Sequence, residues 1–113
     1  MRDEMRILVA VLASFPMIAW ADGFKTLDNA GIVATLTDQK LRYSDAWQEF
    51  FLSGSTLYNA GRDSWGYWRA EGGQYCSQWP PSDVWACYDV LTDGTVIRFV
   101  GAGGTPTDGR VDP

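Results

Sequence analysis

The chain has 113 residues, a formal net charge of −5, two cysteines and no histidine. A chain of this length allows one domain with a core of modest size. The basic residues beyond position 21 are scattered without a run, so they offer no patch that would displace counterions from phosphates, and no nucleic-acid partner is expected. Two cysteines without histidine cannot complete a structural zinc site, so we expect neither a metal nor a cofactor.

Residues 1–21 are predicted to form a cleavable signal peptide. An almost wholly apolar run, residues 7–19, follows Arg6 and leads into Ala19-Trp20-Ala21, the small-x-small pattern that signal peptidase reads. At a rise of about 1.5 Å per residue this run is too short for a hydrocarbon core of roughly 30 Å. We therefore expect cleavage after Ala21 and a periplasmic or secreted protein without a membrane span. Met1 and Met5 are both possible starts.

The mature chain is predicted to be an all-β domain over residues 22–100. Residues 26–36 favour one short N-terminal helix, with Thr26 as a possible cap. From Leu41 onward apolar residues recur with a period of two, and turn signals recur about every ten residues. This pattern predicts an antiparallel meander of about six strands, twisted or half-barrel in shape. Residues 101–113 are rich in glycine and proline and are expected to be a flexible tail.

Turn chemistry predicts the hairpin registers. A two-residue turn at Ser53-Gly54 would set Phe50 opposite Leu57, and one at Asp93-Gly94 would set Asp89 opposite Arg98. The turn at residues 71–73 leaves two registers open, because either Glu-Gly or Gly-Gly can supply its central residues.

Cys76 and Cys87 are predicted to form a structural disulfide. A four-residue loop over residues 80–83 would place the two cysteines directly opposite each other. An even number of cysteines in an exported chain favours a bridge, and a bridge across about a dozen residues removes roughly 3 kcal/mol of unfolded-state freedom.

The last two hairpins divide their side chains between two faces. One face is nearly all apolar and is expected to be the core: Tyr75, Ser77, Trp79, Val84, Ala86, Tyr88, Val90, Ile97 and Phe99. The other mixes polar groups with aromatic ones: Cys76, Gln78, Trp85, Cys87, Asp89, Leu91, Val96, Arg98 and Val100. We take the second face, together with a tryptophan from the preceding hairpin, as the candidate ligand-binding surface, built from Trp68, Trp85, Asp89 and Arg98.

Gly66-Tyr67-Trp68 resembles the glycine-x-tryptophan element that closes the barrel bottom in lipocalins and other calycins. In those families an arginine from a late strand stacks on the tryptophan, a part that the resemblance gives to Arg98. More broadly, the chain resembles a group of small exported proteobacterial β proteins of unknown function. The shared elements are Gly54, the Gly66–Trp68 triplet, Tyr75-Cys76, residues 87–90 and Asp93-Gly94.

These observations predict a non-enzymatic binding domain that takes a small ligand or an envelope component through a surface rich in Trp and Tyr. The alternative is a protein-recognition module, such as an inhibitor of an envelope hydrolase. An enzyme would have to rely on carboxylates such as Glu49, Glu71, Asp83 and Asp89, which are ordinarily solvated charges. No catalytic residue is assigned. A concave aromatic pocket would favour the ligand binder, and a flat aromatic patch would favour the protein partner.

Overall fold

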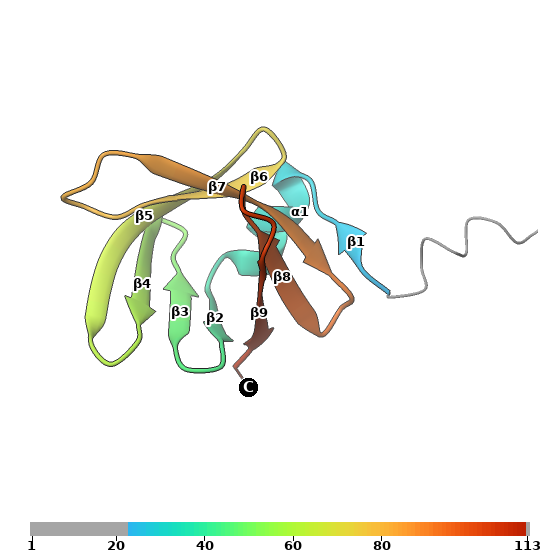
Figure 1. Ribbon diagram of the computed structural model, residues 1–113, viewed down its shortest axis with the longest axis horizontal. Coiled ribbons are helices and arrows are strands. Elements are labelled where there is room, and N and C mark those ends of the chain that lie inside the picture. Colours follow the sequence, from blue (N-terminus) through green and yellow to red (C-terminus); the bar gives the residue numbers. More distant parts are fainter. Residues whose placement is uncertain (1–22, 113) are drawn as a thin grey trace, which may run out of the picture.

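The computed structural model describes residues 23–112, so the expected signal peptide at residues 1–21 lies outside the described residues. Its strands form one antiparallel sheet that closes into an eight-stranded barrel (Figure 1). The barrel strands are β2 (Gln39–Arg42), β3 (Trp47–Phe50), β4 (Ser55–Asn59), β5 (Asp63–Glu71), β6 (Gln74–Gln78), β7 (Trp85–Thr92), β8 (Val96–Val100) and β9 (Pro106–Val111). Within residues 23–112, no helix is long and apolar enough to cross a membrane.

Two short elements precede the barrel strands. β1 (Lys25–Thr26) pairs with Thr92 and Leu91 at the end of β7. The helix α1 (Asn29–Leu36) is capped by Asp28, whose side chain accepts a hydrogen bond from the backbone N–H of Gly31 at 2.8 Å. The predicted helix is therefore confirmed with a later start, and Thr26 is not its cap because that residue is part of a strand.

Closure of the sheet corrects the expected half-barrel of about six strands. β9 pairs with β8 on one side and with β2 on the other, and β7 pairs with β8, so the ring is complete. The same strand, residues 106–111, corrects the expectation of a flexible tail over residues 101–113. Ladder hydrogen bonds to both neighbours order this strand despite its composition, and the glycine within it has a packing role. A Cβ at Gly109 would lie 2.9 Å from the ring of Tyr43 inside the barrel.

Two predicted registers are wrong for a physical reason in each turn. The β3–β4 loop has three residues rather than two, with Gly54 at φ +95°, so Phe50 faces Thr56 and not Leu57. The β7–β8 turn also includes Thr95 and Val96, whose N–H groups donate to the carboxylate of Asp93 at 2.9 and 2.7 Å. Asp89 therefore pairs with Val100, and Arg98 pairs with Leu91.

The other two hairpins agree with the sequence or decide between its alternatives. Cys76 pairs with Cys87, and the predicted disulfide is present with 4.0 Å between the Cα atoms. At the β5–β6 turn Glu71 faces Gln74, so Gly72 and Gly73 are the central residues, with φ of +62° and +79°. Positive φ at both central positions is what a type I′ turn requires.

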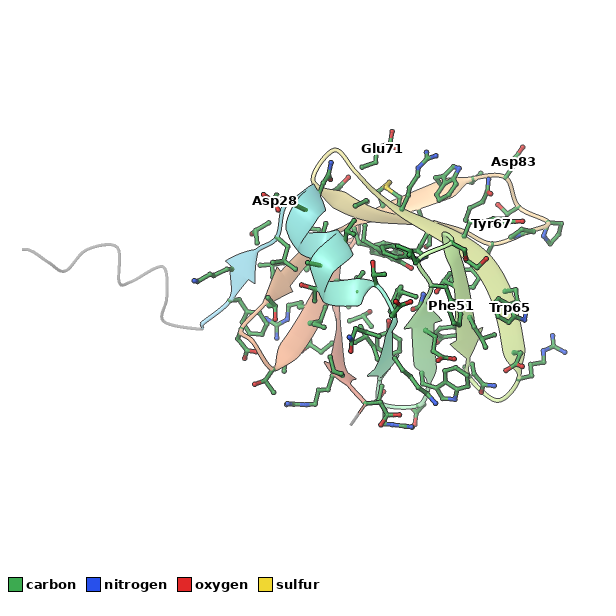
Figure 2. The ribbon with its side chains drawn as sticks, turned by 180° about the vertical axis from the view of Figure 1, so that it is seen from behind. Asp28, Phe51, Trp65, Tyr67, Glu71 and Asp83 are labelled. Atoms are coloured by element: carbon green, nitrogen blue, oxygen red, sulfur yellow. A yellow bond between two sulfur atoms is a disulfide. The ribbon has the colours of Figure 1, made fainter. Side chains whose placement is uncertain are left out.

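The packed core fills the end of the barrel that carries α1. Ile32 and Leu36 from the helix are fully buried, and they pack in one cluster with Leu41, Phe50 and other interior side chains. Asn29 at the start of α1 accepts a hydrogen bond from the backbone N–H of Gly73, which ties the helix to the β5–β6 turn at 2.7 Å. Figure 2 shows α1 crossing this end of the barrel from that turn towards β2. The barrel is therefore plugged at one end.

Trp68 and Trp85 should respond in opposite ways to truncation. Trp68 is 7% exposed, and its Nε1 donates to the carbonyl of Phe51 at 3.0 Å, so Trp68→Ala should cost roughly 3–5 kcal/mol of unfolding free energy. Trp85 lies outside the barrel under the guanidinium of Arg69, so Trp85→Ala should cost about 1 kcal/mol or less. Urea unfolding of both variants measures the difference, and equal losses would show that the core is wrongly placed.

Candidate ligand-binding lumen

The end of the barrel away from α1 is open and holds a cavity of about 780 Å³. Its rim carries residues from the β2–β3, β4–β5 and β6–β7 connections. Seven aromatic residues line it, from six different strands or their ends: Tyr43, Tyr58, Trp65, Tyr75, Trp79, Tyr88 and Phe99. The ring of Trp65 itself stacks on that of Phe51 at the outer side of β5. A concave, largely apolar cavity of this size is typical of a site for a small molecule.

A buried hydrogen-bonded layer forms the floor of this cavity. Gln48, 6% exposed, accepts from the hydroxyl of Tyr43 at 2.8 Å. Its Nε2 donates to Thr56 Oγ1 at 2.9 Å and to the hydroxyl of Tyr75 at 3.0 Å. Thr56 in turn donates to the carbonyl of Glu49 at 2.7 Å. Both amide hydrogens of Gln48 are thus used within the protein, which offsets the cost of burying the amide.

The indole of Trp79 lies inside the mouth of the barrel over Gly66. A Cβ at Gly66 would be 2.6 Å from Cε3 of that indole and 2.6 Å from the carbonyl oxygen of Gln78. Trp79 Nε1 donates to Ser77 Oγ at 3.2 Å, and its ring meets that of Tyr58 edge-on with 6.1 Å between centroids. Glycine is required at position 66 because the strand must leave space for this ring.

Burial raises the pKa of two lumen tyrosines, so both side chains stay neutral at a pH at which an exposed tyrosine would be ionised. Loss of hydration raises the pKa of Tyr75 to about 12, and the same cause raises the pKa of Tyr43 further. Both hydroxyls belong to the Gln48 layer, so the floor consists of neutral phenol, amide and hydroxyl groups.

The charged groups in the described part of the cavity lining are all negative. Asp45 at the rim is the one carboxylate among the described residues that line the cavity, and lysine and arginine are missing from that lining. The arginines and lysines that contact aromatic rings do so elsewhere: Lys40 over Trp47, Arg69 over Trp85, and Arg98 over Phe24.

The structure does not bring together the four residues predicted to bind a ligand. Trp68 is part of the core. Trp85 contacts Arg69 outside the barrel, and Asp89 accepts from Gln74 Nε2 at 3.1 Å on the same outer surface. Because Trp68 points inward and the other three point outward, no single surface contains all four.

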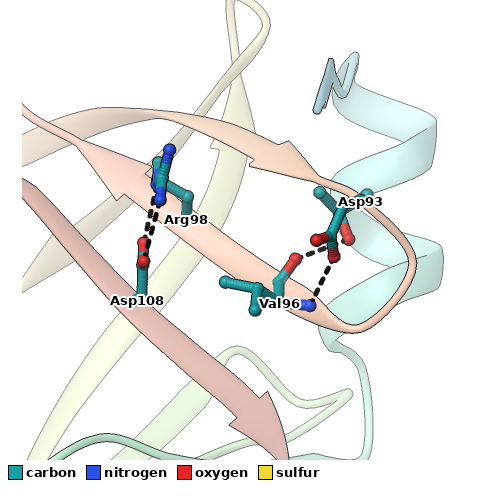
Figure 3. Close-up of polar contacts among 5 residues, drawn as sticks. Asp93, Val96, Arg98 and Asp108 are labelled. Carbon is teal, nitrogen blue, oxygen red and sulfur yellow. Dashed lines mark hydrogen bonds and ion pairs between the residues drawn. The ribbon is translucent and has the colours of Figure 1, made fainter. Parts of the chain in front are cut away.

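Arg98 takes part in a different interaction from the one that the calycin resemblance implies. Its guanidinium forms a two-point pair with the carboxylate of Asp108 on β9, at 2.8 and 2.9 Å (Figure 3). The same guanidinium lies over the ring of Phe24. This hydrogen-bonded pair lowers the pKa of Asp108. Trp68 instead contacts Phe50 and Tyr75, so Arg98 joins β8 to β9 and does not stack on Trp68.

The lumen residues that sequence reasoning missed fall into two groups. The alternation of apolar residues correctly places one group on an inward face but predicts a solid core there, whereas these residues line the cavity: Tyr75, Ser77, Trp79, Tyr88 and Phe99. A serine on an otherwise apolar face was the signal that part of this face is solvated or polar. The second group comes from the first barrel strands: Tyr43, Gln48 and Tyr58. The register predicted at Gly54 is wrong by one residue, so it does not pair Gln48 with Tyr58, and the sequence gives no sign that both point inward.

The described residues offer no metal centre. Within residues 23–112 no group of three or more His, Cys, Asp or Glu side chains is placed to hold an ion. What the lumen can do chemically is to surround an apolar or aromatic body with ring faces, above a floor of neutral polar groups.

Alkaline pH should destabilise the fold through the buried tyrosines. An unfolded tyrosine releases its proton near pH 10, whereas Tyr75 holds its own to about pH 12, so the stabilisation is complete below pH 10 and is lost as the pH rises. Each buried tyrosine should contribute a slope of about 1.4 kcal/mol per pH unit in that window. Urea unfolding between pH 9 and 11.5 measures this slope.

Tyrosine-to-phenylalanine variants show which tyrosines produce this dependence of the unfolding free energy on pH. Tyr75→Phe and Tyr43→Phe should each reduce it, and Tyr67→Phe, at an exposed position on β5, should leave it unchanged. A slope that Tyr67→Phe reduces as much as Tyr75→Phe would contradict the assignment.

Comparisons of the chain with protein-family models, with curated proteins and with solved structures find no match.

Proposed function

We propose that this protein is a non-enzymatic binding protein that holds a small molecule in the open end of its barrel. The observation that carries the proposal is the cavity of about 780 Å³, which is walled by aromatic rings and floored by the Gln48 hydrogen-bonded layer. Such a site buries an apolar ligand body and orients it through few polar contacts.

The distribution of carboxylates supports binding over catalysis. Acid–base hydrolysis by carboxylates needs two of them facing one substrate, and Asp45 is the one carboxylate among the described lining residues. Glu71 pairs with Arg69, and Asp89 interacts with Gln74 on the outer surface. The chain also has no histidine to serve as a general base.

We further propose that the protein acts in the periplasm or outside the cell, after removal of residues 1–21. The Cys76–Cys87 disulfide supports an oxidising compartment, and the apolar run before Ala21 supports export. A periplasmic or secreted binder would meet its ligand among envelope components or in the medium.

A protein partner is the second candidate, and one outer surface favours it. The ring of Trp65 stacks on that of Phe51 with 5.9 Å between centroids, beside Tyr67 on the outside of β5 (Figure 2). Trp65 is 57% exposed, Tyr67 50% and the neighbouring Leu52 77%. We call Phe51, Leu52, Trp65 and Tyr67 the outer patch. Exposed apolar groups that lie together on a surface can mark a protein interface.

Ligand uptake by the lumen should be blocked by filling its mouth. The neutral fluorophore N-phenyl-1-naphthylamine should bind saturably at one site, with a rise in its emission. Ser64 lines the cavity at an exposed position, so Ser64→Trp should reduce the affinity at least about tenfold without unfolding the protein. Fluorescence titration measures both constants.

Two further variants control this test. Thr95→Trp adds the same ring at the exposed β7–β8 turn and should leave binding unchanged. If the double variant Leu52→Ser, Tyr67→Ser, at two outer-patch positions outside the cavity lining, abolished binding while Ser64→Trp did not, the outer patch would be the site and the lumen proposal would fail.

Processing and oxidation can be read from one mass measurement. The product recovered from the periplasm of an expressing bacterium should begin at Asp22, because the peptidase pattern ends at Ala21. Its mass should be two hydrogens below that of the dithiol, since Cys76 and Cys87 are bonded. Intact-mass spectrometry with thiol alkylation under denaturant checks both. A membrane-bound product that retains Met1 or Met5 would contradict the proposed export.

A further inference from the structure

We propose that the lumen selects an organic cation, a ligand whose amine or quaternary ammonium group is carried on an apolar body. This inference rests on the proposed binding function and deepens it by naming the chemical class of the ligand. Three features of the cavity carry it: the continuity of its aromatic wall, the sign of its charge, and the internal use of its hydrogen-bond donors.

The aromatic wall of the lumen contains an unbroken series of ring contacts. Six rings follow one another with successive centroids 5.2 to 6.4 Å apart: Trp79, Tyr58, Tyr43, Phe99, Tyr75 and Tyr88. An aromatic ring carries negative potential on its π faces, and an ammonium group is attracted to such a face within about 6 Å. Several rings that surround one space form the type of cage that binds methylated ammonium groups.

The charge inside and around the lumen favours the same ligand. Asp45 places a carboxylate at the rim, and the described lining has no lysine or arginine that could occupy the cage or attract an anion. On the outer surface, by contrast, the rings of Trp47 and Trp85 already lie beneath Lys40 and Arg69 at 4.2 and 3.9 Å. The chain as a whole carries a net charge of −5, which adds to the attraction of a cation.

Donors at the floor and at the mouth of the cavity are already engaged. Both Nε2 hydrogens of Gln48 go to Thr56 and Tyr75, and the indole N–H of Trp79 goes to Ser77. An anionic ligand or a sugar could use these donors only by breaking bonds that the protein has already formed. A quaternary ammonium group needs no donor, so it can enter without loss of the buried layer.

Choline and its carbon isostere, 3,3-dimethylbutan-1-ol, provide a matched pair of probes because they have nearly the same shape and differ by one positive charge. Isothermal titration calorimetry on the oxidised mature protein should show choline binding at least about tenfold more tightly than the isostere. Competition against N-phenyl-1-naphthylamine in the same samples locates both probes in the lumen.

Matched variants separate the cage from general packing. Tyr58→Phe keeps the ring and should retain choline affinity, whereas Tyr58→Leu should weaken choline several-fold and change the isostere little. Asp45→Asn should also weaken choline alone. Asp83→Asn removes an equal charge from the β6–β7 loop outside the described lining and should have no effect.

The outcomes distinguish this inference from the proposed function. Equal affinity for the two probes, or tighter binding of the isostere, would overturn the cation while N-phenyl-1-naphthylamine binding upheld the lumen. Choline binding that Tyr58→Leu and Asp45→Asn leave unchanged would place the cation elsewhere and also overturn the inference. Failure of all three probes to bind would overturn the cation and the lumen together.

Discussion

The hydrogen bonding of β9 on both of its sides is the constraint on which the rest of the structure depends. With β9 seated between β8 and β2, every barrel strand has two neighbours, and the sheet has an inside. Closure converts one face of a meander into a lumen, and it directs rings from distant strands towards one another. Tyr43 meets Phe99 across the closing strands, and their contact exists only because β2 and β8 flank the same neighbour.

The polar layer centred on Gln48 then divides this interior into two parts with different roles. On the side of α1, Ile32 and Leu36 complete a packed core that provides stability. On the other side the same wall of aromatic rings continues without a plug, and the volume stays open. Tyr75 belongs to both parts, since it contacts Phe50 in the core and lines the cavity with its hydroxyl on the layer. The packed core and the proposed binding volume are thus separated along the barrel axis, although aromatic side chains line both.

Local chemistry explains how much the sequence could predict. The Cys76–Cys87 pairing, the short helix and the inward face of Tyr75, Trp79 and Tyr88 follow from turn signals and from a period of two. Two predicted strand registers are wrong because the turns are longer than expected. The positive φ of Gly54 accompanies the longer β3–β4 turn, and hydrogen bonds to the Asp93 carboxylate accompany the longer β7–β8 turn. The closing strand was missed because its composition resembles a loop, and its order depends on partners more than sixty residues earlier in the chain, such as Leu41. The sequence predicts a site on the outer face, whereas the cavity lies in the lumen, for the same reason: no local sequence pattern indicates whether a sheet closes into a barrel.

The position of β9 along the chain also bears on how the molecule reaches its native state. All other barrel strands precede it, so until residues 106–111 have been synthesised both β2 and β8 expose an unpaired edge. Open edges are templates for pairing with other chains, so this intermediate form would be vulnerable to association. Completing the ring protects both edges in one step and couples the order of the first barrel strand to that of the last. A barrel organised in this way favours all-or-none folding over growth strand by strand.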